Sequence, residues 1–187
     1  MSNRFQIQSL PLAGLMLMER RPICDERGFL ERLFCRDTFL QLGIDGDIQQ
    51  INHTLTRQRG TVRGMHYQVP PHAEVKIVTC LRGEVFDVAV DLRAESPTFL
   101  QWHGEFLSQD NGRMLAIPRG FAHGFQTLTN DCEMLYFHSA NYEPSAERGI
   151  SPLDRQVGII WPLEITDLSQ RDAGHPWLDA CFTGVSL

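Results

Sequence analysis

The sequence has no apolar run long enough to cross a membrane. The longest one, from Leu10 to Met18, has nine residues and includes a proline and a glycine, whereas a spanning helix needs ~20 apolar residues. The N-terminus also lacks a basic region followed by an apolar core and a small-residue cleavage site, which is the pattern of a secretory leader. We therefore expect a cytoplasmic protein with no membrane partner.

Basic charge is scarce as well. The chain has 17 Lys and Arg against 23 Asp and Glu, a net charge of −6, and this argues against a nucleic-acid partner because such proteins usually cluster basic residues. The five cysteines are odd in number and form no C-x-x-C pair, which suits reduced thiols better than a disulfide framework or a zinc site. Any anionic ligand must therefore be bound by a few local arginines or lysines.

Helical periodicity is weak, and the dominant period of the apolar residues is two. The clearest case is EVKIVTCLRGEVFDVAVDLR, residues 74–93, which predicts a hairpin that turns at Arg82-Gly83. In its second half we expect Phe86 and Val88 on one face of the strand and Asp87 and Asp91 on the other. Further short runs are LQWHGEFL, GRMLAIP, GFQTL and CEMLYFH.

These short runs are separated by Gly, Pro, Asn and Asp, which is the spacing of an antiparallel sandwich or barrel. Helical signals are confined to a short turn that Asp37-Thr38 could cap, ending at Gly43, and to the region after Leu168. We therefore expect an all-β jelly-roll barrel with a few short helices, whose inner face lines a pocket. A length of 187 residues suits a single domain, residues 1–187.

Two segments contain a histidine at a fixed spacing after a glycine. GRMLAIPRGFAH, residues 112–123, fits the second cupin signature G-x5-P-x-G-x2-H, in which the glycines and proline form a turn and His123 points inward. In the first segment His66 has the expected spacing from Gly60, but Gln68 stands where metal-binding cupins have a second histidine. Because a transition-metal site generally needs three nitrogen or carboxylate ligands, and the ammonium of nearby Lys76 cannot be one, we expect a barrel without the metal cage.

Several ordered segments extend this pattern over nearly the whole chain. They are DERGF, RGMHYQ, KIVTCLRGEVFDVAVDLR, SPTF, IPRGFAHGFQTL and ERGI, followed by WP and LSQRD. From Asp25 to Asp172 the sequence resembles the dTDP-4-dehydrorhamnose 3,5-epimerase family of the cupin superfamily. The resemblance implies an isomerase of deoxysugar biosynthesis that needs no cofactor and inverts C3 and C5 next to the ketone of a nucleotide-linked 4-keto-6-deoxyhexose.

Epimerisation next to a ketone needs a base, a group that stabilises the enolate, and an acid on the other face. His66 suits the base, because an ordinary neutral imidazole, with a pKa near ~6.5, can accept a proton at cytosolic pH. The resemblance implies that Asp172 holds the far nitrogen of His66, that Lys76 stabilises the enolate, and that Tyr136 is the acid. The alternatives are that His66 is a buried histidine with a structural hydrogen bond and that Tyr136 is an ordinary core tyrosine.

The resemblance also implies a set of substrate contacts. They are Arg63 and His123 at the sugar, Tyr142 as a platform for the base, and Arg27, Gln50, Asn52, Glu147 and Arg171 around the diphosphate and sugar. Arginine suits a diphosphate because its planar guanidinium offers a fork of donors. Two alternatives remain open. Arg63 and Lys76 could form surface ion pairs, and Gln50 and Asn52 could make ordinary polar contacts between strands. We also expect a homodimer in which the segment around Arg27 completes the partner's site.

Two segments depart from the family pattern. Arg32 stands where the family usually has a glutamate, with Glu31 one position earlier, and SPLDRQVGIIWP, after ERGI, lacks the tryptophan and acidic residue often found there. They leave open which nucleotide base and which sugar the substrate has. The reaction could also be inversion at C3 alone or 3,4-ketoisomerisation. Two further classes are a metal-dependent cupin, with His66, His123 and Glu74 as ligands, and a non-catalytic sugar-nucleotide binding module that would need neither His66 nor Tyr136.

Overall fold

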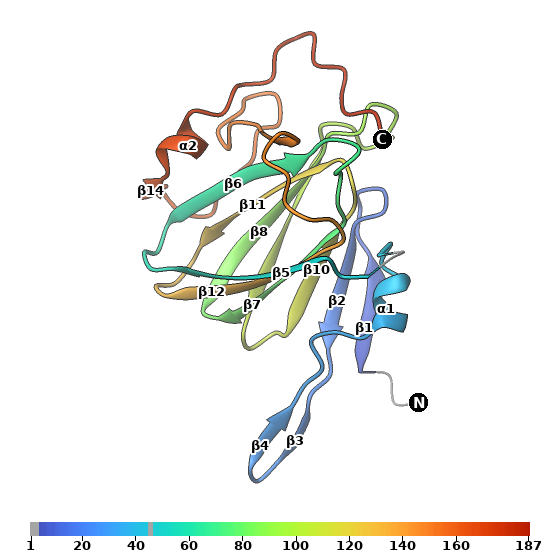
Figure 1. Ribbon diagram of the computed structural model, residues 1–187. Coiled ribbons are helices and arrows are strands. Elements are labelled where there is room, and N and C mark those ends of the chain that lie inside the picture. Colours follow the sequence, from blue (N-terminus) through green and yellow to red (C-terminus); the bar gives the residue numbers. More distant parts are fainter. Residues whose placement is uncertain (1–3, 45–46) are drawn as a thin grey trace.

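The computed structural model describes residues 4–44 and 47–187, and two curved sheets face each other in it (Figure 1). In spatial order the first sheet has β1 (Phe5–Ser9), β2 (Met16–Arg20), β10 (Arg113–Ile117), β7 (Lys76–Arg82), β12 (Cys132–His138) and β5 (Gln50–Thr56). The second has β13 (Glu147–Gly149), β6 (Thr61–Gln68), β11 (Phe121–Thr127), β8 (Glu84–Asp91) and β9 (Trp102–Ser108), with β14 (Asp167–Leu168) parallel to β6. The other pairings are antiparallel, and the predicted jelly-roll barrel is confirmed.

The core of the barrel lies between the two sheets. Leu115 and Val78 of the first sheet and Val85 and Phe125 of the second belong to one cluster of buried side chains. Successive side chains of a strand point to opposite faces, so each strand gives alternate residues to this core. The remaining inward positions toward one end of the barrel are polar and form the site described below.

The predicted hairpin over residues 74–93 is wrong, although both of its strands exist. β7 pairs with β10 and β12, whereas β8 pairs with β11 and β9, so the chain passes from one sheet to the other between them. Gly83 makes this sharp passage with a φ of +77°, which favours glycine. Alternation therefore identified the strands but carried no information about their partners.

The two faces of β8 were assigned correctly, but neither is exposed. Phe86 and Val88 pack under the C-terminal segment with Ile150 and Val157, while Asp87, on the opposite face, is fully buried inside the barrel. Asp91 is fully buried as well. β8 is therefore covered on both of its faces.

Both expected helices are present and short. α1 (Arg36–Leu40) has Cys35 as its N-cap with no side-chain cap, so the predicted cap at Asp37-Thr38 is wrong. α2 (Gln170–Ala173) has Ser169 as its N-cap, and the side chain of Ser169 accepts the N–H of Asp172 at 3.0 Å. This cap fixes the position of Asp172, which lies beside the site.

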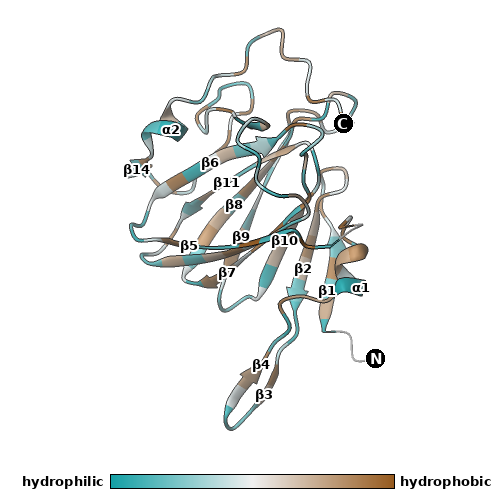
Figure 2. Cartoon of the chain, in the orientation of Figure 1, coloured by the Kyte–Doolittle hydropathy of each residue, from teal (hydrophilic) through white to brown (hydrophobic). Residues whose placement is uncertain are grey.

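A two-stranded hairpin, β3 (Ile23–Asp25) and β4 (Gly28–Leu30), projects from the barrel (Figure 1). Its arms expose Ile23, Phe29 and Leu30, and Figure 2 shows these apolar arms with a hydrophilic tip. Across residues 4–44 and 47–187, no helix is long and apolar enough to cross a membrane. The five cysteines are free thiols, as expected.

The packing of the barrel core can be tested with two leucines. Leu115→Ala, at a fully buried position, should lower the free energy of unfolding by ~2 to 5 kcal/mol because it leaves a cavity between the sheets. Leu153→Ala, at a half-exposed loop position, should change it by no more than ~0.5 kcal/mol. Urea unfolding measures both, and equal losses in the two variants would contradict the assigned core.

Candidate active site

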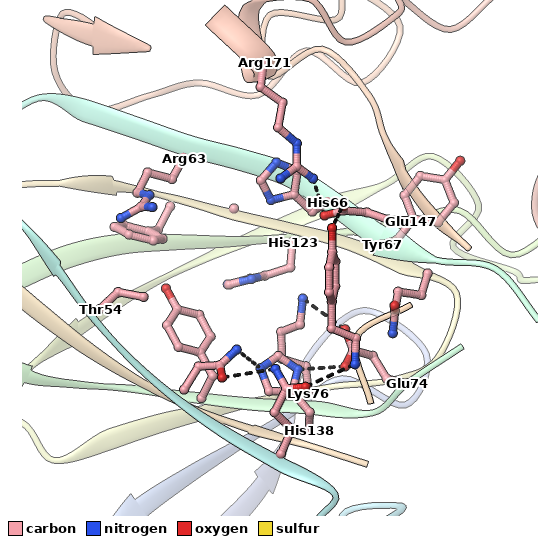
Figure 3. A pocket seen from close by; sticks show the side chains of 17 residues that line it. Thr54, Arg63, His66, Tyr67, Glu74, Lys76, His123, His138, Glu147 and Arg171 are labelled. Carbon is pink, nitrogen blue, oxygen red and sulfur yellow. Dashed lines mark hydrogen bonds and ion pairs between the residues drawn. The ribbon is translucent and has the colours of Figure 1, made fainter. Parts of the chain in front are cut away.

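A cavity of about 580 Å³ lies between the two sheets. One wall comes from β5, β7 and β12 and the other from β6 and β11, with further residues from the segments after β12 and β14 (Figure 3). This volume is typical of a small-molecule site. Ten of the predicted residues line it: Gln50, Asn52, Arg63, His66, Lys76, His123, Tyr136, Tyr142, Glu147 and Arg171.

An irregularity in β6 brings Arg63 and His66 to the same wall, although they are three residues apart. Gly64 has a φ of +126°, and the pairing of β6 with β11 shifts register opposite it. A side chain at Gly64 would collide with the backbone of Gly124. The shift changes which residues face inward, so this glycine allows both basic side chains to enter the cavity.

Asp172 lies directly behind His66. Its Oδ1 accepts a hydrogen bond from His66 Nε2 at 2.7 Å, and its Oδ2 accepts the backbone N–H of Gly64 at 3.2 Å. Burial alone would raise the pKa of Asp172, but the hydrogen bonds from His66 and Gly64 outweigh it and lower that pKa. Because the carboxylate holds the Nε2 proton, Nδ1 is the nitrogen of His66 that is free to accept a proton.

Tyr136 lies on β12, in the wall opposite β6. Its side chain is buried, its ring stacks on that of His138 with centroids 6.1 Å apart, and it meets the ring of His123 edge-on. Burial raises the pKa of Tyr136 well above its usual value. The phenol therefore keeps its proton at neutral pH and can act as an acid.

Lys76, the single lysine of the sequence, lies in a buried polar cluster on the same wall. Its Nζ is 3.5 Å from Glu74 Oε1, and Glu74 Oε2 accepts a hydrogen bond from His138 Nδ1 at 2.7 Å. Burial alone would raise the pKa of Glu74, but Lys76 and His138 outweigh it and lower that pKa. The partner of Lys76 is thus a buried carboxylate at the cavity rather than a surface group.

Sequence reasoning missed His138 and considered Glu74 only as a metal ligand. His138 follows Tyr136 by two positions on one strand and so shares its face, which is the signal that could have identified it. Asn52 Nδ2 lies 3.4 Å from His138 Nε2. Asn52 is therefore connected to Lys76 through His138 and Glu74.

His123 is held by the carboxylate of Asp87, on the neighbouring strand β8. Its Nε2 lies 3.0 and 2.9 Å from the two carboxylate oxygens of Asp87. Burial lowers the pKa of His123 and raises that of Asp87, and the contact between them opposes both shifts. Asp87 fixes the imidazole ring of His123 at the cavity wall.

Polar side chains form the mouth of the cavity. Arg171 reaches from α2 to form an ion pair with Glu147 (Figure 3), and the Tyr142 hydroxyl donates to Glu147 Oε2 at 2.7 Å. Gln50 accepts the backbone N–H of Tyr142 at 3.1 Å and donates to Asn52 Oδ1 at 3.0 Å. Half of the Tyr142 side chain is exposed, so its ring is accessible to a ligand.

Arg63 and Gln68 lie at the cavity wall, whereas Arg27 does not. Arg63 donates to Thr56 Oγ1 at 3.3 Å and lines the cavity. Arg27 lies at the tip of the projecting hairpin, where its side chain is 89% exposed and paired with Asp25, so the structure does not bring it to the cavity of its own chain. Gln68 donates to the backbone of His72 and Asn141 and thus connects loops.

The ligand set of the metal-dependent alternative is also not brought together. His123 is engaged by Asp87, and Glu74 by Lys76 and His138. In the part of the chain that the structure describes, the His, Cys and acidic side chains close enough to share an ion are His66, Asp172 and His175. Only one member of the expected set belongs to this group.

Known proteins share this sequence and fold. The family model for dTDP-4-dehydrorhamnose 3,5-epimerase matches residues 9–180. An enzyme of that name from Salmonella typhimurium is 44% identical over 170 residues, which cover 90% of this chain and 92% of the relative. One from Sinorhizobium fredii is 42% identical over 172 residues, covering 91% of this chain and 88% of the relative.

Solved structures agree with this assignment. The epimerase of Legionella pneumophila, in complex with dTDP-4-keto-L-rhamnose, has a TM-score of 0.90 and 38% identity, covering 98% of each chain. A 3'-monoepimerase from Streptomyces bikiniensis, in complex with dTDP-quinovose, has a TM-score of 0.83 and 33% identity, covering 90% of this chain and 85% of that one. The chain belongs to the dTDP-4-dehydrorhamnose 3,5-epimerase family and is an isomerase, as its ordered sequence segments implied.

Proposed function

We propose that this protein inverts C3 and C5 of a nucleotide-linked 4-keto-6-deoxyhexose, converting a substrate of the dTDP-4-dehydro-6-deoxyglucose type to the dTDP-4-dehydrorhamnose type. The observation that carries the proposal is the pair of opposed groups in one cavity. His66 offers an unprotonated Nδ1 from one wall, and Tyr136 offers a protonated phenol from the other. The complex of the Legionella relative supports this class of substrate.

The chemistry at C3 follows from this geometry. A C–H bond next to a ketone is acidic enough for a positioned imidazole to remove the proton, and the electrons of that bond then delocalise onto the C4 oxygen as an enolate. Lys76 is the cation of the cavity wall suited to stabilise that oxygen, because an ammonium in a water-poor site interacts strongly with developing charge. Tyr136 donates a proton to the opposite face of C3, which inverts the centre and regenerates the ketone.

Inversion at C5 repeats the same steps. His66 first loses its proton to solvent and the Tyr136 phenolate regains one, after which C5 is deprotonated and reprotonated from the opposite face. Each centre loses one proton and gains another, so the net reaction requires no oxidant and no metal ion. The Glu74–His138 pair holds Lys76 at the wall throughout both rounds.

The mouth residues suit the nucleotide portion. Arg171 offers a guanidinium for a diphosphate oxygen, and the exposed ring of Tyr142 offers a stacking surface for the base. We further propose that the chain works as one catalytic domain, residues 1–187, in a cytoplasmic homodimer. The exposed apolar arms of the β3–β4 hairpin and the open edge of β5 support a second copy as the partner, with Arg27 reaching that copy's cavity.

A C3-only epimerase is the second candidate. It is favoured by the similarity to the Streptomyces bikiniensis protein described as a 3'-monoepimerase. The two reactions share the first base, the enolate and the acid, and they differ in whether His66 and Tyr136 also act at C5. Product labelling decides between them.

Replacing the base should abolish the first step. His66→Asn should lower the rate of C3 proton exchange in deuterated water by ~10² to 10⁴, the usual contribution of a positioned base, while binding of dTDP stays near the wild-type affinity. Proton NMR follows the exchange and calorimetry follows the binding. His53→Asn, which changes an exposed histidine of β5, is the control and should exchange normally; a folded His66→Asn protein that exchanges at the wild-type rate would remove His66 from the mechanism.

Removing the phenol should separate the two carbons. With dTDP-4-dehydro-6-deoxyglucose in deuterated water, the wild type should incorporate deuterium at both C3 and C5. Tyr136→Phe should keep C3 exchange and lose most C5 inversion, because the opposite face has lost its proton donor. Tyr67→Phe changes a tyrosine on the His66 side of the cavity and should label both carbons.

The same spectra discriminate the competing functions. Wild-type product labelled at C3 alone, on every nucleotide-linked 4-keto sugar tested, would contradict the double inversion and support the C3-only epimerase. A product whose ketone has moved from C4 to C3 would indicate a ketoisomerase. Binding without any exchange would indicate a non-catalytic module.

A further inference from the structure

His175 lies beside the pair formed by His66 and Asp172. His175 follows α2, its side chain is 13% exposed, and its ring meets that of His66 edge-on with centroids 5.2 Å apart. The ring packs directly on Gly149 of β13, where any side chain would collide with it. Its Nε2 is buried and has no hydrogen-bond partner within the described residues. A buried polar atom without a partner is uncommon and calls for an explanation.

The unpaired nitrogen of His175 faces the carboxylate that already holds His66. His175 Nε2 is 3.6 Å from Asp172 Oδ1, and His66 Nε2 is 2.7 Å from the same oxygen. The ligand atoms of the three residues all lie within 4.8 Å of one another. Tetrahedral Zn²⁺ with bonds of ~2.0 to 2.1 Å separates its ligand atoms by about 3.3 Å, so modest side-chain shifts would bring these atoms to that spacing.

We propose that His66, Asp172 and His175 form a three-ligand site for Zn²⁺, and that the bound ion inhibits the enzyme. Two imidazoles and one carboxylate are a donor set that binds Zn²⁺ and leaves a fourth position for water. An entry path exists, because a surface groove of about 630 Å³ between β6 and α2 reaches both His66 and Asp172. Asp172 and His175 are not among the residues that line the substrate cavity, whereas His66 is.

The position of the site determines how zinc would inhibit. The ion occupies His66 Nε2 and replaces its hydrogen bond to Asp172. The ring proton moves to Nδ1, because a neutral imidazole that is bound to a metal through one nitrogen carries its proton on the other, and Nδ1 can then no longer accept a proton from the substrate. Substrate contacts inside the barrel stay unchanged. Zinc should therefore lower kcat with little change in KM.

The test uses the full-length protein, freed of metal by a chelator and titrated with ZnCl₂. Calorimetry should show one ion per chain, and zinc should lower kcat about tenfold or more while the chelator restores full activity. His175→Ala should keep the wild-type kcat without zinc and weaken zinc inhibition by ~10-fold or more. His53→Ala removes an exposed histidine on β5 and should be inhibited like the wild type.

Two results would overturn the proposal: a wild-type protein that saturating zinc neither binds nor inhibits, or a His175→Ala protein inhibited as strongly as the wild type. If His175→Ala fails to fold, His175→Gln and the absorption of Co²⁺ in the wild type take its place. Four-coordinate Co²⁺ gives intense visible bands, whereas a weak six-coordinate spectrum would contradict the site. Ion binding and the Co²⁺ spectrum require no substrate, so they test the site even if the proposed function fails.

Discussion

The hydrogen bond between His66 Nε2 and Asp172 Oδ1, 2.7 Å long, connects two parts of the chain that are 106 residues apart. His66 belongs to the barrel, and Asp172 belongs to a one-turn helix in the segment that covers it. The helix is placed by the Ser169 cap, and the carboxylate is placed by the N–H of Gly64. The orientation of one imidazole thus depends on the C-terminal segment docking on the outer side of β6.

The barrel gives the two walls of the cavity different chemistry. β6 contributes the imidazole, whose Nδ1 is free, while β7 and β12 contribute a cation and a protonated phenol. All three tyrosines and the single lysine of the sequence line this cavity. Charged and polar groups are costly inside a barrel unless paired. Glu74 pairs with Lys76 and His138, and Asp87 pairs with His123.

Much of this arrangement could be predicted from the sequence, because strand periodicity and the ordered motifs are local signals. They identified the barrel, its strands from β7 to β12, and ten of the side chains in the cavity. Partner choice between strands is not local, and for that reason the passage at Gly83 was taken for a hairpin turn. The same limit hid the role of Asp87, since alternation does not show which face of a strand points into the barrel.

Other features depended on pairs of residues distant in sequence. His138 and Glu74 are 64 positions apart and meet only through the pairing of β7 with β12. His175 meets His66 only because α2 docks beside β6 and Gly149 leaves room for the ring. Arg27 matched a substrate-binding position, yet it lies at the tip of a hairpin that projects away from its own barrel.

The tautomer of His66 tests most directly whether this residue is the base, because a base toward the substrate needs a ring nitrogen that carries no proton. Nitrogen-15 NMR of the seven histidines, with His66 assigned by the loss of its signals in His66→Asn, reports which ring nitrogen carries the proton when the ring is neutral. We expect a proton on Nε2, shared with Asp172, and none on Nδ1. A neutral His66 with its proton on Nδ1 would contradict this expectation.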